Sequence, residues 1–403
     1  MYILNKDIYQ IHFFKSFSYI FLESSSSFMI ANEIETIILK ECISNNNVDF
    51  IINDLKTNYN ILDTSLIKNT INSVIETFYN LLEIIDIPNN SFKNIIVTGN
   101  KNKKFPQSLQ VYLTNQCPHK CVHCFQGNIS NLINIDKFAL FTMLNYLKGN
   151  TSQIQFSGGE PLLYPYICEL IDNYYKDFQI SITTSGYYLN NDILMSLKKC
   201  QTVQISLYSH ISNIHNNFTK TNNSFENIIK NISKMVNNNI NVGISHIITL
   251  SNYNKIEDFI KYCIQLNVSY IKFGTIIPIG GAKNKIEYIL PTEIINYSHN
   301  NILKLKEKYK NKIFIFDWNK NNYGVGENFF KCGAGEISWS INENGEIYPC
   351  AFMESKDLLK GNIYDKDYIN IINDNNTKYK FIDNLSSIKI DNININQICS
   401  SHI

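Results

Sequence analysis

Cysteine chemistry is concentrated in one short stretch of this sequence. Residues 117–124 read Cys-Pro-His-Lys-Cys-Val-His-Cys, so three thiols fall within eight residues, after the apolar run 109–114. A mononuclear zinc site usually takes four ligands from paired Cys or His sets, and no second pair lies close by in the sequence. Three thiolates can instead hold an iron–sulfur cubane and leave one iron open to bind a small molecule. A zinc knuckle or a chance group of cysteines remains the alternative at this stage.

The spacing of Cys117, Cys121 and Cys124 resembles the signature of the radical S-adenosylmethionine (SAM) superfamily. The resemblance implies that these cysteines bind a [4Fe–4S] cluster whose open iron chelates SAM. It also implies reductive cleavage of SAM to a 5′-deoxyadenosyl radical that abstracts a hydrogen atom. His123 takes a position that an aromatic residue near the adenine usually holds, so we expect it to stack on SAM rather than to bind metal.

Strands and helices must alternate to position this loop. The apolar runs predict six strands, which are separated by helical patterns near 136–149, 164–176, 191–199, 224–238 and 253–266. The predicted strands cover 109–114, 153–156, 179–184, 203–208, 242–248 and 270–277. Right-handed βα units of this kind predict an α/β fold with a partial (β/α)6 TIM-like barrel over residues 107–290. In such a barrel the loops after the strands carry the chemistry, and the cysteine loop follows the first strand.

Further candidate residues follow the next strands. Gly158, Gly159 and Glu160 come directly after the second strand, where the superfamily places the motif that holds the amino group of SAM. Glycines allow a close backbone approach, and their free amides and carbonyls can bond a charged amino-acid group. Ser185 and Ser206 end the third and fourth strands, where small hydroxyls suit the ribose and carboxylate of SAM. Ordinary strand-end capping remains an alternative for both serines.

A second set of cysteines lies near the C-terminus. Cys332, the glycine turn at Gly345 and Cys350 resemble the opening of a SPASM or Twitch auxiliary-cluster domain, with a hairpin formed by 337–341 and 346–348. The resemblance implies an auxiliary iron–sulfur cluster, which Cys399 and perhaps His402 would complete. A full SPASM domain should supply more cysteines, so 331–403 is expected to be a shortened domain, joined to the barrel by a bridging segment over 291–330. Two structural cysteines in a hairpin are the alternative.

Residues 1–88 predict a small domain of short strands followed by three helices. This pattern resembles the winged-helix-like peptide-recognition domain of enzymes that modify ribosomally made peptides. In that family a leader peptide adds a strand to an open sheet edge. A generic helical cap or dimerisation domain is the alternative, and residues 89–106 are expected to be a linker.

Composition limits the remaining possibilities. The net charge of +1 and the 18% of charged residues argue against a nucleic-acid footprint. No apolar run is long enough to span a membrane, and no signal peptide is evident, so a cytoplasmic location is expected. Ten cysteines in a cytosolic chain of 403 residues indicate metal or redox chemistry rather than a disulfide framework.

The resemblance therefore leads to one functional hypothesis with two alternatives. The hypothesis is a radical SAM enzyme that forms a thioether or carbon–carbon crosslink, or makes a related C–H change, in a ribosomally made precursor peptide. Its partners would be that peptide and an electron donor such as flavodoxin or ferredoxin, and no catalytic residue beyond the cluster is assigned. The first alternative is a radical SAM dehydrogenase or sulfatase-maturase-like enzyme acting on a small molecule or a protein. The second is a non-catalytic iron–sulfur or peptide-binding protein.

Overall fold

The chain forms two compact units in a computed structural model. Unit 1 comprises residues 1–107 with 321–336, and unit 2 comprises 108–320 with 337–403. Each unit is described by itself. The structure describes residues 2–5, 7–14, 17–22, 28–45, 47–59, 63–78, 82–85, 95–127, 131–283, 285–316, 334–373, 389–390 and 393–394. No helix within these ranges is long and apolar enough to cross a membrane.

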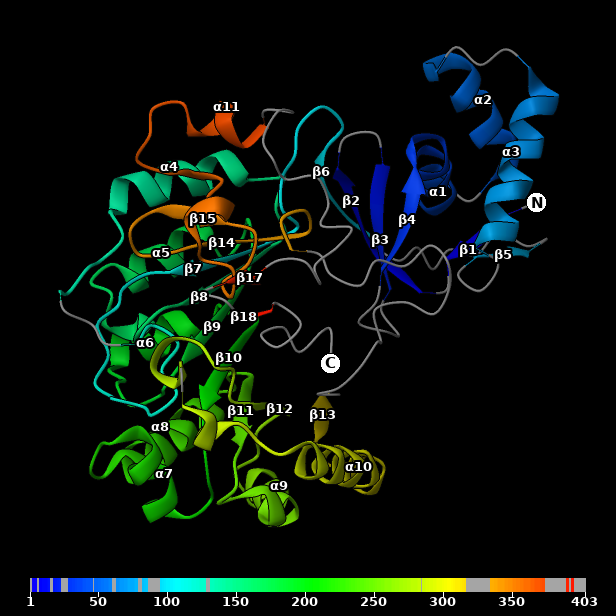
Figure 1. Ribbon diagram of the computed structural model, residues 1–403. Helices are drawn as coiled ribbons and strands as arrows, with labels where there is room; N and C mark the ends of the chain where they lie inside the picture. The colour runs from blue at the N-terminus through cyan, green and yellow to red at the C-terminus, as the bar shows by residue number, and fades with distance from the viewer. Residues whose placement is uncertain are drawn as a thin grey trace. The chain divides into compact units, whose positions relative to one another are not determined.

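Unit 1 combines a four-stranded sheet with three helices (Figure 1). The sheet order is β4-β3-β2-β6, with antiparallel pairs except for the parallel β2–β6 pair. Its elements are β1 Tyr2–Asn5, β2 Ile8–Phe14, β3 Phe17–Leu22, β4 Phe28–Asn32, α1 Glu33–Asn45, α2 Val48–Tyr59, α3 Thr64–Thr77, β5 Leu82–Ile85 and β6 Ile96–Asn100. Helices α1 to α3 bury their apolar positions, among them Ile38, Leu55 and Ile71, in one core with β2 and β3.

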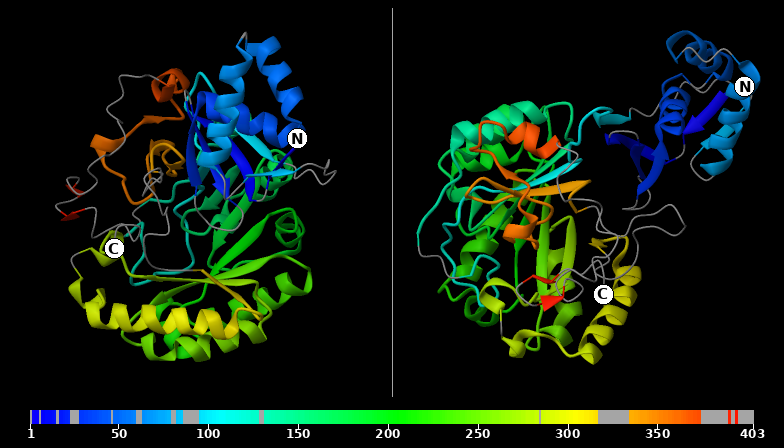
Figure 2. Two further views of the ribbon diagram at one scale, coloured as in Figure 1. Left: turned by 90° about the vertical axis from the view of Figure 1, so that its right-hand side faces the viewer. Right: turned by 45° about the horizontal axis from the view of Figure 1, so that its top comes forward.

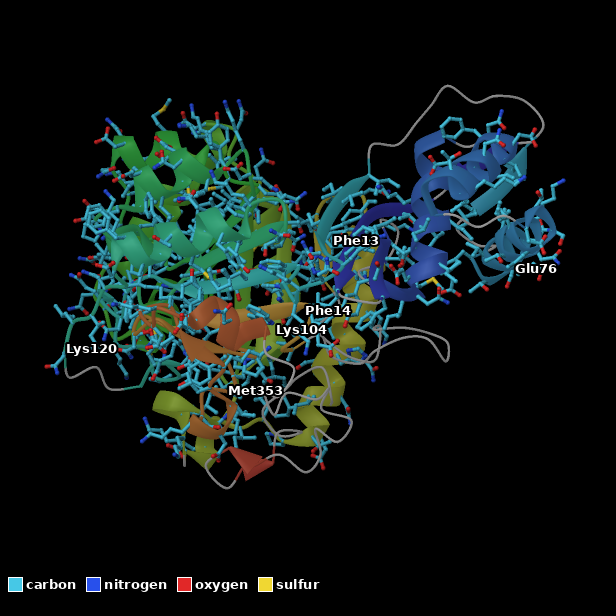
Figure 3. The ribbon with its side chains drawn as sticks, turned by 90° about the horizontal axis from the view of Figure 1, so that it is seen from above. Phe13, Phe14, Glu76, Lys104, Lys120 and Met353 are labelled. Atoms are coloured by element: carbon cyan, nitrogen blue, oxygen red, sulfur yellow. The ribbon has the colours of Figure 1, made fainter. Side chains whose placement is uncertain are left out.

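Neighbouring residues on β2 have different surroundings. Phe14 is buried and packs against Phe17 and Tyr19, with ring centroids 5.6 and 6.0 Å apart. Phe13, which is labelled with Phe14 in Figure 3, is half-buried. The Lys101 ammonium lies 5.6 Å from its ring centroid. Successive side chains on a strand point to opposite faces, so β2 supplies apolar surface to both sides of the sheet.

Residues 89–106, predicted to be a linker, contain a strand instead. β6 pairs with β2, and the His12 side chain joins β2 to this segment. Its Nδ1 lies 2.9 Å from Thr98 Oγ1, and its Nε2 lies 2.9 Å from the Phe105 carbonyl oxygen. A carbonyl only accepts, so Nε2 carries the proton and Nδ1 accepts from Thr98. The polar and Asn-rich composition of the segment concealed this pairing, which depends on buried side-chain partners rather than on an apolar pattern.

The buried His12 makes the stability of unit 1 depend on pH. Burial lowers the pKa of His12 to about 4, against 6.5 for an unperturbed histidine, while the bond to Phe105 opposes the shift. The unfolded chain therefore gains a proton first as the pH falls below 6.5, and unit 1 should lose about 2 kcal/mol of stability by pH 5. Hydrogen exchange of β2 in the apo chain, corrected for intrinsic rates, should report faster opening at pH 5 than at pH 7. An equal pH response in His12→Gln would contradict this assignment.

Unit 2 is built on one ten-stranded sheet, ordered β13-β12-β11-β10-β9-β8-β7-β14-β15-β16. The strands from β7 to β13 are parallel, β14 is parallel to β7, and β15 and β16 run antiparallel to their neighbours. Its strands are β7 Ser108–Tyr112, β8 Gln153–Ser157, β9 Gln179–Thr184, β10 Thr202–Ser206, β11 Val242–Ile248, β12 Tyr270–Thr275, β13 Phe314–Phe316, β14 Ser338–Ile341, β15 Glu346–Tyr348 and β16 Gly361–Asn362. A separate two-stranded pair consists of β17 Lys389–Ile390 and β18 Ile393–Asn394.

Helices follow the parallel strands and cover the outer face of the curved sheet (Figures 1 and 2). They are α4 Lys137–Leu147, α5 Ile167–Tyr174, α6 Asn191–Leu197, α7 Ser212–Thr219, α8 Ser224–Asn237, α9 Ile256–Gln265 and α10 Thr292–Tyr309. A further helix, α11 Tyr368–Asn373, follows the antiparallel strand β16, and short 3-10 turns lie at Pro161–Leu163, Tyr253–Lys255, Gly280–Ala282, Ile286–Tyr288 and Lys356–Leu358. Each strand alternates, so Ile154 and Phe156 of β8 are fully buried while Gln153 and Gln155 are half-buried. Burying each such apolar side chain stabilises the folded state by about 1.5–3 kcal/mol.

The predicted partial barrel is confirmed, and three features extend it. α7 falls in a gap between predicted elements, and α10 with β13 falls in the predicted bridging segment 291–330. The predicted hairpin at Gly345 is present, with β14 and β15 on either side of a residue at φ +77°. Its first strand pairs with β7, so the hairpin continues the barrel sheet. The pairing joins residues more than two hundred positions apart, which periodicity alone does not reveal.

Candidate active site

The cysteine loop lies after β7, and two other loops hold its backbone. The Lys120 amide donates to the Thr219 carbonyl (3.0 Å), and the Val122 amide donates to the Phe218 carbonyl (3.2 Å), so the end of α7 fixes the middle of the loop. From the loop after β12, the Gly281 amide donates to the Cys124 carbonyl at 2.7 Å. The loop is therefore bound at the carboxyl ends of β7, β10 and β12, where barrel chemistry is expected.

The three thiols are close enough to influence one another electrostatically. Burial raises the pKa of Cys117 to about 12, and negative charge on Glu160 and Cys124 raises it further. Burial likewise raises the pKa of Cys121 to about 12, with contributions from charge on Cys117 and Cys124. The neighbouring His119 is neutral because burial lowers its pKa to about 4. Without an added cation the thiols of Cys117 and Cys121 stay protonated at neutral pH, and bound iron is the kind of charge that would hold them as thiolates.

Within the described ranges, no group of three His, Cys, Asp or Glu side chains is placed to hold one metal ion. In a cubane each of three thiolates binds a different iron.

An aromatic wall encloses the thiols, and sequence reasoning missed its central member, Tyr208. Tyr208 is fully buried, and burial raises the pKa of its hydroxyl well above the usual value. The same hydroxyl interacts with Ser206 and with the Cys121 thiol. His123 packs against the rings of Tyr208 and Phe218, at centroid distances of 5.2 and 4.8 Å. Tyr208 could have been suspected because it follows Ser206 by two residues at the same strand end.

His123 Nδ1 is buried without a hydrogen-bond partner in the described part of the chain. Burial lowers the pKa of His123 to about 4, so the ring is neutral. The imidazole is held by aromatic contacts and keeps a polar atom available to a ligand. The stacking role expected for His123 stays a prediction.

The glycines after β8 interlock with the segment that enters the cysteine loop. The Gly159 amide donates to the Thr114 carbonyl (2.6 Å), and the Glu160 amide donates to the Gln116 carbonyl (2.7 Å). The Gly159 amide, which the sequence predicted to be free, is therefore bonded within the protein, and the role of these residues in binding SAM stays a prediction. Gly158 has φ +129°, and a Cβ on Gly159 would lie 2.4 Å from the Gln116 carbonyl oxygen. Glycine is required here because two backbone segments approach so closely.

Glu160 joins the ends of β8 and β9. Its side chain is fully buried, and Oε1 accepts from the Leu162 amide (3.0 Å) and the Thr184 hydroxyl (2.5 Å). Oε2 accepts from both the amide (2.9 Å) and the hydroxyl of Ser185. Burial raises the pKa of Glu160, whereas the bonds from Ser185, Thr184 and Leu162 oppose that shift. Ser185, predicted to contact SAM, thus has its hydroxyl committed to this carboxylate in the structure.

Glu160→Gln should destabilise the fold by about 1–3 kcal/mol. The amide turns one accepting oxygen into a donor that faces two other donors, which leaves buried groups unpaired. Urea unfolding of the apo chain measures the loss, and the exposed Glu287 offers a matched control as Glu287→Gln. Equal midpoints for the two variants would contradict the assigned bonding.

The auxiliary site is described only in part. Cys350 is half-buried after β15 and belongs to unit 2. The segments on both sides of it pack against the cysteine loop. The ring centroids of Phe352 and Phe125 lie 5.9 Å apart, and in the β14–β15 turn Glu343 Oε2 accepts from Gln126 Nε2 at 3.2 Å. Met353, labelled in Figure 3, follows Phe352 in the chain and is buried. The other predicted ligands, Cys332 and Cys399, and His402 lie outside the described residues.

Two family models match this chain. Residues 111–263 match the radical SAM superfamily, and residues 332–401 match SPASM, an iron–sulfur cluster-binding domain. The chain is therefore a radical SAM enzyme. It belongs to the group that carries a SPASM region, and its cofactors are a [4Fe–4S] cluster, SAM and an auxiliary iron–sulfur cluster.

The chain is similar to several named proteins. An uncharacterised protein of Methanocaldococcus jannaschii, MJ0907, is 29% identical over 64% of this chain and 89% of its own length. The antilisterial bacteriocin subtilosin biosynthesis protein AlbA of Bacillus subtilis is 24% identical over 72% of this chain, and the match spans 65% of AlbA. Streptococcus suis SuiB, solved with its precursor peptide SuiA, superposes with a TM-score of 0.69 at 18% identity, covering 99% of this chain and 95% of SuiB. That likeness shows a shared fold over both units.

Proposed function

We propose that this enzyme modifies a ribosomally made precursor peptide by forming a thioether or carbon–carbon crosslink, or a related change at a C–H bond. The observation that carries the proposal is the combination of an open-edged N-terminal sheet with a cysteine-bearing barrel loop and a SPASM region. The similarity to AlbA, a bacteriocin biosynthesis protein, and the fold shared with peptide-bound SuiB support a peptide substrate.

The residues of the site divide into binding and positioning groups. Cys117, Cys121 and Cys124 would hold the SAM-cleaving cluster, and Cys332, Cys350 and Cys399 would serve the auxiliary cluster. When bound and reduced, the first cluster supplies the electron that cleaves SAM to a 5′-deoxyadenosyl radical.

The SAM contacts follow from the surroundings of the cysteine loop. His123 would stack on SAM, and Ser206 with the carbonyls of Gly158 and Gly159 would orient it. Glu160 and Ser185 would not contact SAM, because their polar atoms bond each other. They would instead hold the ends of β8 and β9 in place next to the SAM site.

The test is anaerobic reconstitution with iron and sulfide, followed by dithionite, SAM and the peptides encoded beside the gene. We expect 5′-deoxyadenosine, together with a peptide product lighter by two hydrogens for each crosslink. SAM cleavage that leaves every peptide unchanged would favour a small-molecule or protein substrate, as in the dehydrogenase or sulfatase-maturase alternative. A protein with a full cluster that makes no 5′-deoxyadenosine would support the non-catalytic alternative.

The reaction needs a low-potential electron, so we propose a flavodoxin or ferredoxin as the natural donor and the reducing cytoplasm as its setting. A reduced flavodoxin that replaces dithionite in the same assay would support both points.

A further inference from the structure

The concave face of the barrel encloses a polar hollow that the proposed function does not explain. It has a volume of about 490 Å³ and is lined by inward side chains of β7 to β10, β12, β13 and β14, with Cys350 on one side. Its polar lining includes the amides and hydroxyls of Gln110, Gln153, Gln155, Gln204, Ser181 and Ser340. Such groups bond peptide amides and carboxylates equally well.

Lys272 is the exception in this lining. Among the described residues around the hollow it alone carries a charge, and no acidic side chain lines the wall with it. The salt bridges of the described residues do not include it. Its side chain is exposed to the hollow, yet the surrounding protein desolvates the ammonium and lowers its pKa. A desolvated ammonium without an anionic partner is energetically costly, so a bound anion would stabilise it strongly.

The strand register relates Lys272 to Ser206. Lys272 pairs with Ser245 on β11, and Ser245 pairs with Ser206 on β10. Alternation along β12 directs Ile271 and Phe273 into the core under the helices, so Lys272 faces the concave side. The ammonium therefore lies in the hollow inside the barrel, two strands away from the serine near Tyr208.

We propose that Lys272 is a specificity-determining residue that binds a carboxylate of the substrate peptide inside the barrel. The inference rests on the proposed function and adds the chemistry of the bound segment. The glutamines and serines of the hollow bond the neighbouring peptide groups, and Lys272 selects a segment with an acidic side chain or a free C-terminal carboxylate. The hollow offers no second cation among the described residues that could replace it.

The experiment labels lysines in the reconstituted full-length chain with acetic anhydride and reads each position by mass spectrometry. The probes are acetyl-Gly-Gly-Glu-Gly-Gly-amide, its Gln counterpart, and acetyl-pentaglycine with a free carboxylate. We expect the Glu peptide to protect Lys272 and the Gln peptide to do so about tenfold less effectively, since one charge-assisted bond separates them. The exposed Lys304 should react equally in every sample.

Calorimetry of the same probes on variants gives the second readout. Lys272→Gln should weaken Glu-peptide binding about tenfold, Lys272→Arg should retain it, and Lys304→Gln should match wild type. Protection by the free-carboxylate pentaglycine alone would support the same chemistry and identify the chain terminus as its source. Equal binding of the Glu and Gln peptides, or protection of Lys272 by SAM alone, would overturn the proposal. 5′-Deoxyadenosine is assayed in the same samples. A lack of 5′-deoxyadenosine would count against the proposed radical SAM function, whereas the protection of Lys272 reports only on carboxylate binding.

Discussion

The triple substitution Cys117→Ala, Cys121→Ala and Cys124→Ala is expected to abolish 5′-deoxyadenosine formation completely. Each of these thiols sits on a loop whose backbone is fixed by Thr219, Phe218 and Gly281, so the fold keeps the loop while the iron ligands disappear. Iron and sulfide analysis after anaerobic reconstitution measures the change together with SAM cleavage.

The iron that remains in this variant reports on the auxiliary site. Retained iron would assign a second cluster to the Cys350 region, and its absence would leave that assignment without support. The matched control is Cys263→Ala, because Cys263 is fully buried on α9, and burial raises the pKa of its thiol. The control should lose some stability, about 1 kcal/mol, and retain SAM cleavage. A triple variant that still makes 5′-deoxyadenosine would exclude these cysteines as the cleaving site.

The apolar patterns of single segments were sufficient to predict the repeated βα units of the barrel. Strands such as 179–184 alternate between buried and half-buried residues, and the helices between them have clear apolar faces, so the barrel followed from the sequence. The placement of Cys117 and of Gly158 after consecutive strands was also predictable, because parallel strands bring their following loops to one end. The hairpin at Gly345 had its turn residue in the sequence.

Non-local pairing was the part that could not be predicted. β6 is held by His12 and Thr98, and β14 pairs with β7, and neither contact leaves a periodic pattern. The amide of Gly159 was expected to be free because a sequence does not show that the segment 114–116 approaches it. Lys272 did leave a signal, since it interrupts an otherwise apolar strand. The role of Lys272 could not be inferred from the sequence, because the sequence does not show which side chains of β12 face the concave side of the sheet.

A proline on the open edge of unit 1 is expected to uncouple peptide binding from SAM cleavage. β4 lies at one edge of the described four-stranded sheet and bonds β3 along Phe28–Asn32. In an antiparallel pair, alternate residues direct their amides toward the partner strand and toward the open edge. Of Met29→Pro and Ile30→Pro, one variant therefore removes an outward amide and leaves the β3 pairing intact.

That variant should bind a precursor peptide about tenfold more weakly, since strand addition depends on backbone hydrogen bonds. It should form 5′-deoxyadenosine as wild type does, because the cysteine loop belongs to unit 2. Met29→Ala and Ile30→Ala keep both amides and should keep peptide binding, which separates a backbone effect from a side-chain effect. Fluorescence anisotropy of a labelled peptide gives the affinities. If both proline variants bind as tightly as the alanine variants, β4 does not receive the leader, and the N-terminal unit is better explained as a structural cap.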